Sequence, residues 1–153
     1  MKDNDLSFDT ALKQAQDLGF AEADPTFDIE GVDAAHKITI MASIAFGIPI
    51  NFDAVFIEGI NGLDQKDISY AEELGYRIKL LALAKLEERG VEVRVHPTLI
   101  PESRLVANVS GPMNAVLVKG NMVGPTLYYG AGAGAEPTAV SYTHLRAHET
   151  TRH

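Results

Sequence analysis

An acidic stretch that ends in a lysine is the part of this sequence whose residue types could do chemistry. Residues 18–37, LGFAEADPTFDIEGVDAAHK, hold five carboxylates and end with His36 and Lys37. Carboxylates that converge on a pocket could hold a substrate ammonium group through charge-assisted hydrogen bonds. A lysine beside them could bind a substrate oxygen, stabilise charge there or relay a proton. The pattern is compatible with an active site for a small cationic or zwitterionic substrate.

Two other interpretations compete for residues 19–37. In the first, the stretch is a solvated loop in which Asp33 caps a helix and pairs with Lys37 at i, i+4, a common surface arrangement. In the second, the acids bind a metal ion, but they lack the spacing of a calcium loop, and we expect no metal site. Pro25 and Gly31 favour an active site, because a solvated loop does not need a fixed path. The residue types alone leave the solvated loop and the active site open.

The composition is that of one soluble globular domain. The chain has 153 residues, of which 46% are hydrophobic and 22% are charged. The formal net charge of -8 argues against nucleic-acid partners and against a polybasic membrane anchor. The absence of cysteine excludes disulfides, Cys-ligated zinc and thiol catalysis. We find no signal-peptide core and no run of about 18 apolar residues, so we expect a cytoplasmic protein with no membrane partner.

Helical spacing places the acidic stretch between two helices. Residues 7–18 carry apolar side chains at helical spacing, with Ser7 as the N-cap and Gly19 as the C-terminal stop. Residues 20–32 are predicted to be an irregular acidic loop. A second helix is predicted over 33–46.

This second helix should be ended by Gly47. Its apolar positions wrap most of the way round after Lys37, so we expect its later turns to be buried. Asp33, His36 and Lys37 lie at i, i+3 and i+4 and therefore share one polar face of the first turns.

The second half of the chain is typical of a short helix followed by two antiparallel hairpins. VEVRVH alternates strictly and EERG supplies a turn. Gly120-Asn121 suits a turn with positive φ, and Pro125 places its strand at an edge or bulge. The expected elements are a helix over 66–75, a hairpin of 77–86 with 91–96, and a hairpin of 114–119 with 122–130. Their order predicts an α+β fold in which helices pack on one face of a mostly antiparallel, mixed sheet.

The segment AQDLGFAEADPTFDIEGVDAAHK resembles the substrate-site motif of homoserine dehydrogenases. That motif runs as Ala, three residues, Gly, an apolar residue, an acidic stretch with Asp-Pro, then Asp, Gly-x-Asp and a Lys four residues later. Every fixed element is present: Ala15, Gly19, Asp24, Pro25, Asp28, Gly31, Asp33 and Lys37. The resemblance continues through FIEGI to VSGPMNAVLVKGNMVGPTLYYGAGAGAEPTA and covers nearly all of residues 7–139.

The resemblance implies a substrate and dimerisation domain of an enzyme that interconverts L-homoserine and L-aspartate 4-semialdehyde with NAD or NADP. That reaction lies on the route to threonine, methionine and isoleucine. The resemblance also implies that Glu22, Asp28 and Asp33 contact the amino acid substrate and that the carboxylates suit its ammonium group. Lys37 would approach the hydroxyl or carbonyl oxygen together with Asp33, as the catalytic pair. His36 could simply pack or hydrogen-bond beside Lys37.

The glycine run GAGAGAEPT, residues 130–138, does not fit the G-x-G-x-x-G fingerprint and by itself indicates a tight turn. The family resemblance implies that this loop closes near the nicotinamide, with Gly132 and Gly134 as cofactor neighbours. Family enzymes carry an N-terminal Rossmann domain, and we recognise no such βαβ unit in this sequence. We therefore expect one part of the enzyme, in which NAD or NADP is bound mainly by a domain outside this chain, and we expect no homoserine oxidation by this part alone.

Residues 140–153, VSYTHLRAHETTRH, break the family pattern and resemble a translated sequencing adapter. We expect residues 1–139 to be the substrate and dimerisation domain and the last 14 residues to be a non-native tail. In the intact enzyme we expect a homodimer formed through the sheet. The rival function is a stand-alone amino-acid-binding or regulatory module without dehydrogenase activity.

Overall fold

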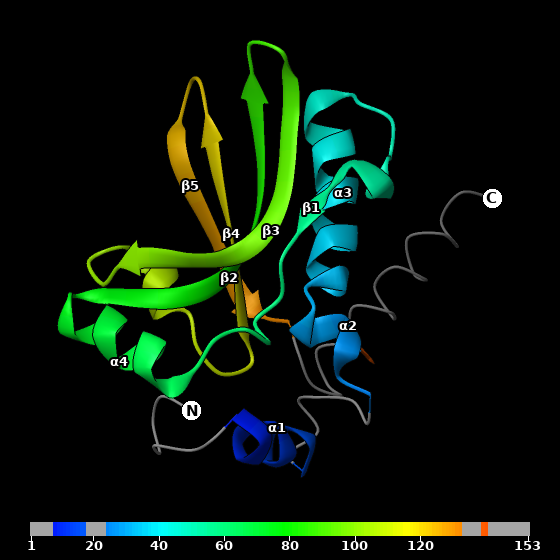
Figure 1. Cartoon of the computed structure of the whole chain (residues 1–153). Coiled ribbons are helices and arrows are strands. Elements are labelled where there is room, and N and C mark those ends of the chain that lie inside the picture. Colours follow the sequence, from blue (N-terminus) through cyan, green and yellow to red (C-terminus); the bar gives the residue numbers. More distant parts are fainter. Residues whose placement is uncertain (1–7, 18–23, 133–138, 141–153) are drawn as a thin grey trace.

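The elements of the chain form an α+β fold, which confirms the predicted class (Figure 1). A computed structural model describes residues 8–17, 24–132 and 139–140. The helices are α1 (Phe8–Asp17), α2 (Thr26–Ile29), α3 (Val32–Phe46) and α4 (Gln65–Glu73), with 3-10 turns η1 (Phe52–Ala54) and η2 (Leu105–Asn108). The strands are β1 (Phe56–Ile57), β2 (Tyr76–Glu87), β3 (Gly90–Pro101), β4 (Met113–Gly120) and β5 (Gly124–Ala131).

The strands of the described residues form two sheets, one of three strands in the order β1-β3-β2 and one of two strands, β4 and β5. β2 and β3 form the first predicted hairpin, which is longer than expected because β3 continues past Pro97. The short β1 pairs in parallel with β3 only at Arg94 and Val95, so β3 has a free edge beyond them. Pro97 lies at this free edge, where a residue without an N–H is tolerated. The parallel β1 makes the sheet mixed, and it is an element that the sequence pattern did not predict.

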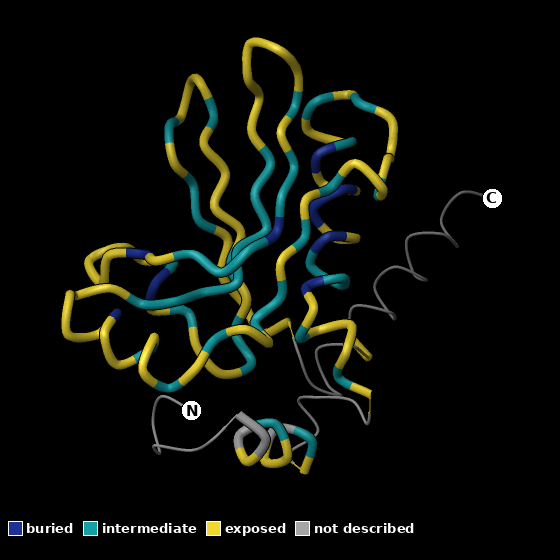
Figure 2. The backbone as a smooth tube through the Cα atoms, in the orientation of Figure 1, coloured by how far each residue is buried: buried dark blue, intermediate teal, exposed yellow. Residues whose placement is uncertain are grey.

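Helix α3 packs on β2 and β3, while α4 packs on β2. The centre of the core is formed by Ala35, Ile38 and Val95, and the buried positions of α3 lie on its sheet side (Figure 2). The expectation that the later turns of α3 are buried holds on one face of the helix only. Ile40 is 50% exposed and Ile44 is 81% exposed, because only one face of the helix meets the sheet.

The start of α3 also differs from the prediction. The helix begins behind Gly31, which has φ of +80° and occupies the N-cap position without a side-chain hydrogen bond. Asp33 is therefore a first-turn residue, and the interpretation in which it caps the helix from a solvated loop is not supported. The predicted irregular loop over 20–32 contains α2, a single helical turn. Gly47 ends α3 with φ of +66°, as predicted.

The β4–β5 hairpin is confirmed, but its turn differs in detail. Gly124 has a positive φ of +73°, whereas Gly120 does not. Gly120 is the last residue of β4 and pairs with Gly124. Pro125 lies opposite Lys119 in a two-stranded sheet, where each strand has a free edge, so its predicted edge placement is confirmed.

The two remaining helices lie close to their predicted ranges. Asp64 caps α4 by accepting the backbone N–H of Asp67, and the Asp67 carboxylate accepts the Asp64 N–H in return, each at 2.9 Å. This capping box was not recognised in the sequence. α1 falls within the predicted range, whereas the capping roles of Ser7 and Gly19 lie outside the described residues.

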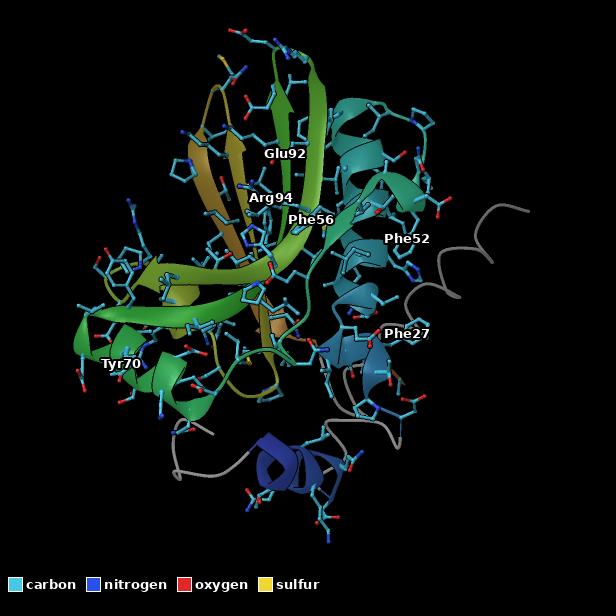
Figure 3. All side chains as sticks on the ribbon, viewed as in Figure 1. Phe27, Phe52, Phe56, Tyr70, Glu92 and Arg94 are labelled. Atoms are coloured by element: carbon cyan, nitrogen blue, oxygen red, sulfur yellow. The ribbon has the colours of Figure 1, made fainter. Side chains whose placement is uncertain are left out.

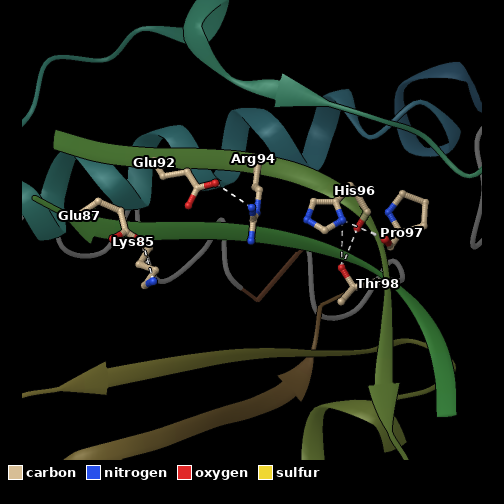
Figure 4. A network of polar contacts seen from close by, with 7 residues as sticks. All are labelled: Lys85, Glu87, Glu92, Arg94, His96, Pro97 and Thr98. Carbon is tan, nitrogen blue, oxygen red and sulfur yellow. Dashed lines mark hydrogen bonds and ion pairs between the residues drawn. The ribbon is translucent and has the colours of Figure 1, made fainter. Parts of the chain in front are cut away.

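The face of β3 opposite α3 is polar along the middle of the strand (Figure 4). Side chains alternate along a strand, so Arg94 and His96 point away from the helix that buries Val95. Arg94 donates to Glu92 at 2.7 Å, and the Nδ1 of His96 lies 2.9 Å from the Pro97 carbonyl oxygen. Exposed ion pairs of this kind contribute about 0–1 kcal/mol each.

Candidate active site

Asp33 and Lys37 form a direct ion pair on the first turns of α3. Lys37 Nζ donates to Asp33 Oδ2 at 2.5 Å, as the i, i+4 spacing predicts. The two side chains are 43% exposed for Asp33 and 66% exposed for Lys37. The pair therefore faces solvent, where a substrate could reach both groups.

Asp24 and Asp28 lie at the helical turn that precedes this pair. Thr26 donates to Asp24 Oδ1 from its hydroxyl at 2.5 Å and from its backbone N–H at 3.1 Å. These two hydrogen bonds, the hydroxyl one first, lower the pKa of Asp24 below its ordinary value of 3.8. Asp24 is thus ionised but engaged in the local turn, whereas the exposed Asp28 lies on α2 itself.

Gly31 joins α2 to α3 in close contact with the sheet. It is buried, and a Cβ there would lie 3.0 Å from Val95 Cγ1 and 3.5 Å from Ile57 Cγ2. Its positive φ allows the chain to change direction between the two helices. The helix that carries Asp28 and the helix that carries Asp33 are consequently connected at a point fixed against β1 and β3.

Gly59 also lies in close contact with the connection between α2 and α3. A Cβ at Gly59 would lie 2.5 Å from the Ile29 carbonyl oxygen and 2.7 Å from Glu30 Cα. The next residue, Ile60, donates its N–H to the Ile29 oxygen at 2.8 Å. The end of α2 is therefore clamped by the backbone of a segment about 30 residues further along the chain. This role was not predicted from the sequence, although FIEGI is among the segments that carry the family resemblance.

His36 packs against aromatic rings from two other elements. Its ring centroid lies 4.3 Å from that of Phe52 and 6.2 Å from that of Phe27, both edge-on. Figure 3 labels Phe27 near α2 and Phe52 beside α3. Of the two possibilities raised from the sequence, packing is the one that these ring contacts support.

The remaining predicted site residues lie elsewhere or outside the described part. Glu22 and Gly134 belong to ranges that the structure does not describe. Gly132 follows β5, and its N–H donates to the Pro112 carbonyl oxygen at 3.1 Å. A Cβ at Gly132 would clash with the side chain of Asn114. Its proximity to a cofactor stays a prediction.

Two other kinds of feature are absent from the described residues. Within residues 8–17, 24–132 and 139–140, no three His, Asp or Glu side chains are grouped as metal ligands. In the same part of the chain, no helix combines the length and apolar character needed to cross a bilayer.

A family model described as homoserine dehydrogenase matches residues 1–144. The chain belongs to the homoserine dehydrogenase family. It is 66% identical over 139 residues to a homoserine dehydrogenase of Neisseria gonorrhoeae, a match covering 91% of this chain and 32% of that protein. It is 62% identical over 141 residues to a homoserine dehydrogenase of Pseudomonas aeruginosa, covering 92% of this chain and again 32% of the relative.

Solved homoserine dehydrogenase structures share the fold. A crystal structure from Thiobacillus denitrificans superimposes with a TM-score of 0.87 at 68% identity, covering 91% of this chain and 32% of that one. A Staphylococcus aureus structure gives a TM-score of 0.86 at 41% identity, covering 100% of this chain and 39% of that one. The chain thus spans about a third of the length of the curated relatives it matches.

Proposed function

We propose that this chain supplies the substrate-binding and catalytic acid–lysine part of an NAD- or NADP-dependent homoserine dehydrogenase. The observation that carries the proposal is the direct contact of Lys37 with Asp33, at 2.5 Å, in a chain of this family. The contact lies beside a helix connection held by Gly31 and Gly59. A stand-alone binding module is not favoured, because the family match and the relatives described above are homoserine dehydrogenases.

In the proposed reaction the carbinol carbon of homoserine is oxidised and its hydroxyl proton is lost. Bound NAD or NADP would supply the acceptor for the hydride from that carbon. Lys37 donates a hydrogen bond to the hydroxyl oxygen and stabilises the negative charge that develops there. Asp33, already hydrogen-bonded to Lys37, keeps the ammonium group of Lys37 in place. The hydroxyl proton can pass through Lys37 to Asp33.

The described residues fit only a limited contact with the cofactor. The N–H of Gly132 is already bonded to Pro112, so this residue could offer close backbone approach but not a free N–H donor. The described elements contain no strand–turn–helix phosphate site. We propose that NAD or NADP is bound mainly by a domain outside this chain, with Gly132 and Gly134 beside the nicotinamide.

Glu22 and Asp28 are proposed to bind the ammonium group of homoserine. We expect Glu22→Gln to raise the KM for homoserine about tenfold with little change in kcat, because the acceptor of one charge-assisted hydrogen bond loses its negative charge in both ground and transition states. Steady-state kinetics with varied homoserine measures this. Glu30→Gln, an exposed acid of the same stretch outside the motif, is the matched control and should leave KM unchanged. An unaltered KM in Glu22→Gln would exclude the proposed ammonium contact.

The activity is tested in a chimeric enzyme. The matching third of the Neisseria gonorrhoeae relative is replaced by residues 1–139 of this chain, which is feasible at 66% identity. We expect NAD(P)-dependent oxidation of homoserine by the chimera, and none by the 153-residue chain alone. A folded chimera without turnover, together with homoserine binding to the chain alone in isothermal titration, would instead favour the binding module.

A homodimer is proposed because the β4–β5 hairpin exposes large apolar side chains. Val116, Val118 and Tyr128 share one face of the hairpin, since Val116 pairs with Tyr128, and they are 40%, 48% and 63% exposed. Exposed apolar patches of this kind mark interfaces in soluble proteins. Sedimentation equilibrium of the chimera should give the mass of a dimer, and a monomer at micromolar concentration would contradict the proposal.

Three further assignments belong to the same proposal. The enzyme would act in the cytoplasm, on the route to threonine, methionine and isoleucine. Residues 1–139 would form the substrate and dimerisation domain, and residues 140–153 would be a non-native tail. The coding DNA tests the tail, since a sequence that differs throughout from a library adapter would show that it is native.

A further inference from the structure

His36 lies where the three segments around the candidate site meet. Phe27 belongs to α2, His36 to α3 and Phe52 to η1, and the imidazole contacts both phenyl rings edge-on. Edge-to-face contact at these centroid separations is the preferred arrangement of aromatic pairs. The three rings therefore form a small cluster, here called the aromatic clamp, that joins these segments through side chains.

The clamp is anchored at one end only. Phe52 packs against the core cluster of Ala35, Ile38 and Val95. Phe27, at the other end, is 58% exposed. The imidazole of His36 is thus the link between a phenylalanine anchored in the core and a phenylalanine on the short helix α2.

Two members of the clamp are each next to a proposed substrate-binding residue. Phe27 immediately precedes Asp28, and His36 immediately precedes Lys37. Helix α2 has only four residues and no buried side chain, so it cannot fix its own position by core packing. The backbone contacts at Gly31 and Gly59 hold its C-terminal end. The clamp adds a side-chain contact between α2 and α3, from Phe27 to His36.

We propose that His36 is a positioning residue that holds α2, and with it Asp28, in place relative to the Asp33–Lys37 pair. The effect on catalysis rests on the proposed function. The role requires a flat ring at position 36 and does not require a titrating nitrogen. A proton relay through His36 to Lys37 would require the nitrogen.

Three variants separate these roles. His36→Ala removes the ring, and His36→Phe keeps a ring but no titrating group. Phe27→Ala removes the phenyl ring on α2 that His36 contacts. Phe56→Ala is the matched control, because Phe56 is 59% exposed, close to the value for Phe27, but lies on β1.

The first measurement uses the 153-residue chain and does not depend on activity. Backbone order parameters from ¹⁵N relaxation should fall over residues 26–29 in His36→Ala and Phe27→Ala, from about 0.85 towards 0.6. They should stay unchanged in His36→Phe and Phe56→Ala, and over residues 90–101 in every variant. Unchanged order over 26–29 in His36→Ala would overturn the clamp.

The second measurement is the kcat/KM for homoserine in the chimeric enzyme. We expect His36→Ala to lower it roughly tenfold, less than the roughly 100-fold that a displacement of about 1 Å can cost, with most of the effect in KM. His36→Phe should restore it to within about twofold of the parent, with an unchanged pH profile. A His36→Phe variant as impaired as His36→Ala would overturn the positioning role in favour of proton transfer. If the parent chimera is inactive, the proposed function fails, and the order parameters alone decide the clamp.

Discussion

Replacing Lys37 by alanine is expected to lower kcat for homoserine by about 10²–10⁴-fold in the chimeric enzyme, the usual range for loss of a group that assists proton transfer. Lys37 supplies the cation beside the reacting oxygen in the proposed mechanism. Its side chain is 66% exposed, and Asp33 is its only hydrogen-bond or ion-pair partner among the described residues, so the fold should not depend on it. We expect the free energy of unfolding to change by less than about 0.5 kcal/mol.

Lys85→Ala is the matched control for this prediction. Lys85 pairs with Glu87 at 2.5 Å and is 70% exposed, so its contact and exposure match those of Lys37. The hydrogen bond to Glu87 raises the pKa of Lys85 above its ordinary value. Because this pair lies at the turn of the β2–β3 hairpin, Lys85→Ala should leave kcat unchanged. Normal turnover in Lys37→Ala, or an equal loss in Lys85→Ala, would remove Lys37 from the mechanism.

Replacing Gly59 by alanine should destabilise the chain by about 3 kcal/mol, at the upper end of the usual cost of overpacking. The new methyl group would meet the Ile29 carbonyl oxygen and Glu30 Cα, and neither is a flexible side chain that can move aside. Relief of this clash requires the connection from α2 to α3 to shift, which also weakens the hydrogen bond from Ile60 to Ile29. Urea unfolding of the 153-residue chain measures the loss as a lower midpoint.

Gly62→Ala is the control, since a Cβ at Gly62 meets nothing within 4 Å and its φ is not in the left-handed region. Its stability should be equal to that of the parent or slightly higher, because alanine restricts the unfolded chain. In the chimera, Gly59→Ala should also reduce turnover of the protein that remains folded, because the shift moves Asp28 and Asp33 relative to each other. Equal midpoints for the two glycine variants would contradict the close approach at Gly59.

The spacing of residues along the sequence was sufficient to predict the elements that carry the candidate site. The i, i+4 separation of Asp33 and Lys37 placed them on one helical face, and the structure confirms their contact. Strict alternation over residues 91–96 indicated a strand, and β3 includes that range. These predictions succeeded because helix and strand periodicity depend on residues close in sequence.

The errors arose where distant segments meet. One interpretation of the sequence made Asp33 the helix cap, yet Gly31 occupies that position because the chain turns there against Val95. The pattern of α3 suggested burial all round, whereas Ile44 is 81% exposed because the sheet covers one face only. Local periodicity cannot tell which apolar face meets a neighbour.

The sequence by itself determined the family motif, the α+β order of elements and the pairing of Asp33 with Lys37. Only the tertiary structure decided that Gly59 must lack a side chain and that His36 lies between Phe27 and Phe52. The physical reason is the range of the interactions. Backbone sterics and helical spacing act between near neighbours, whereas steric exclusion and ring packing act between segments that only the folded chain brings together.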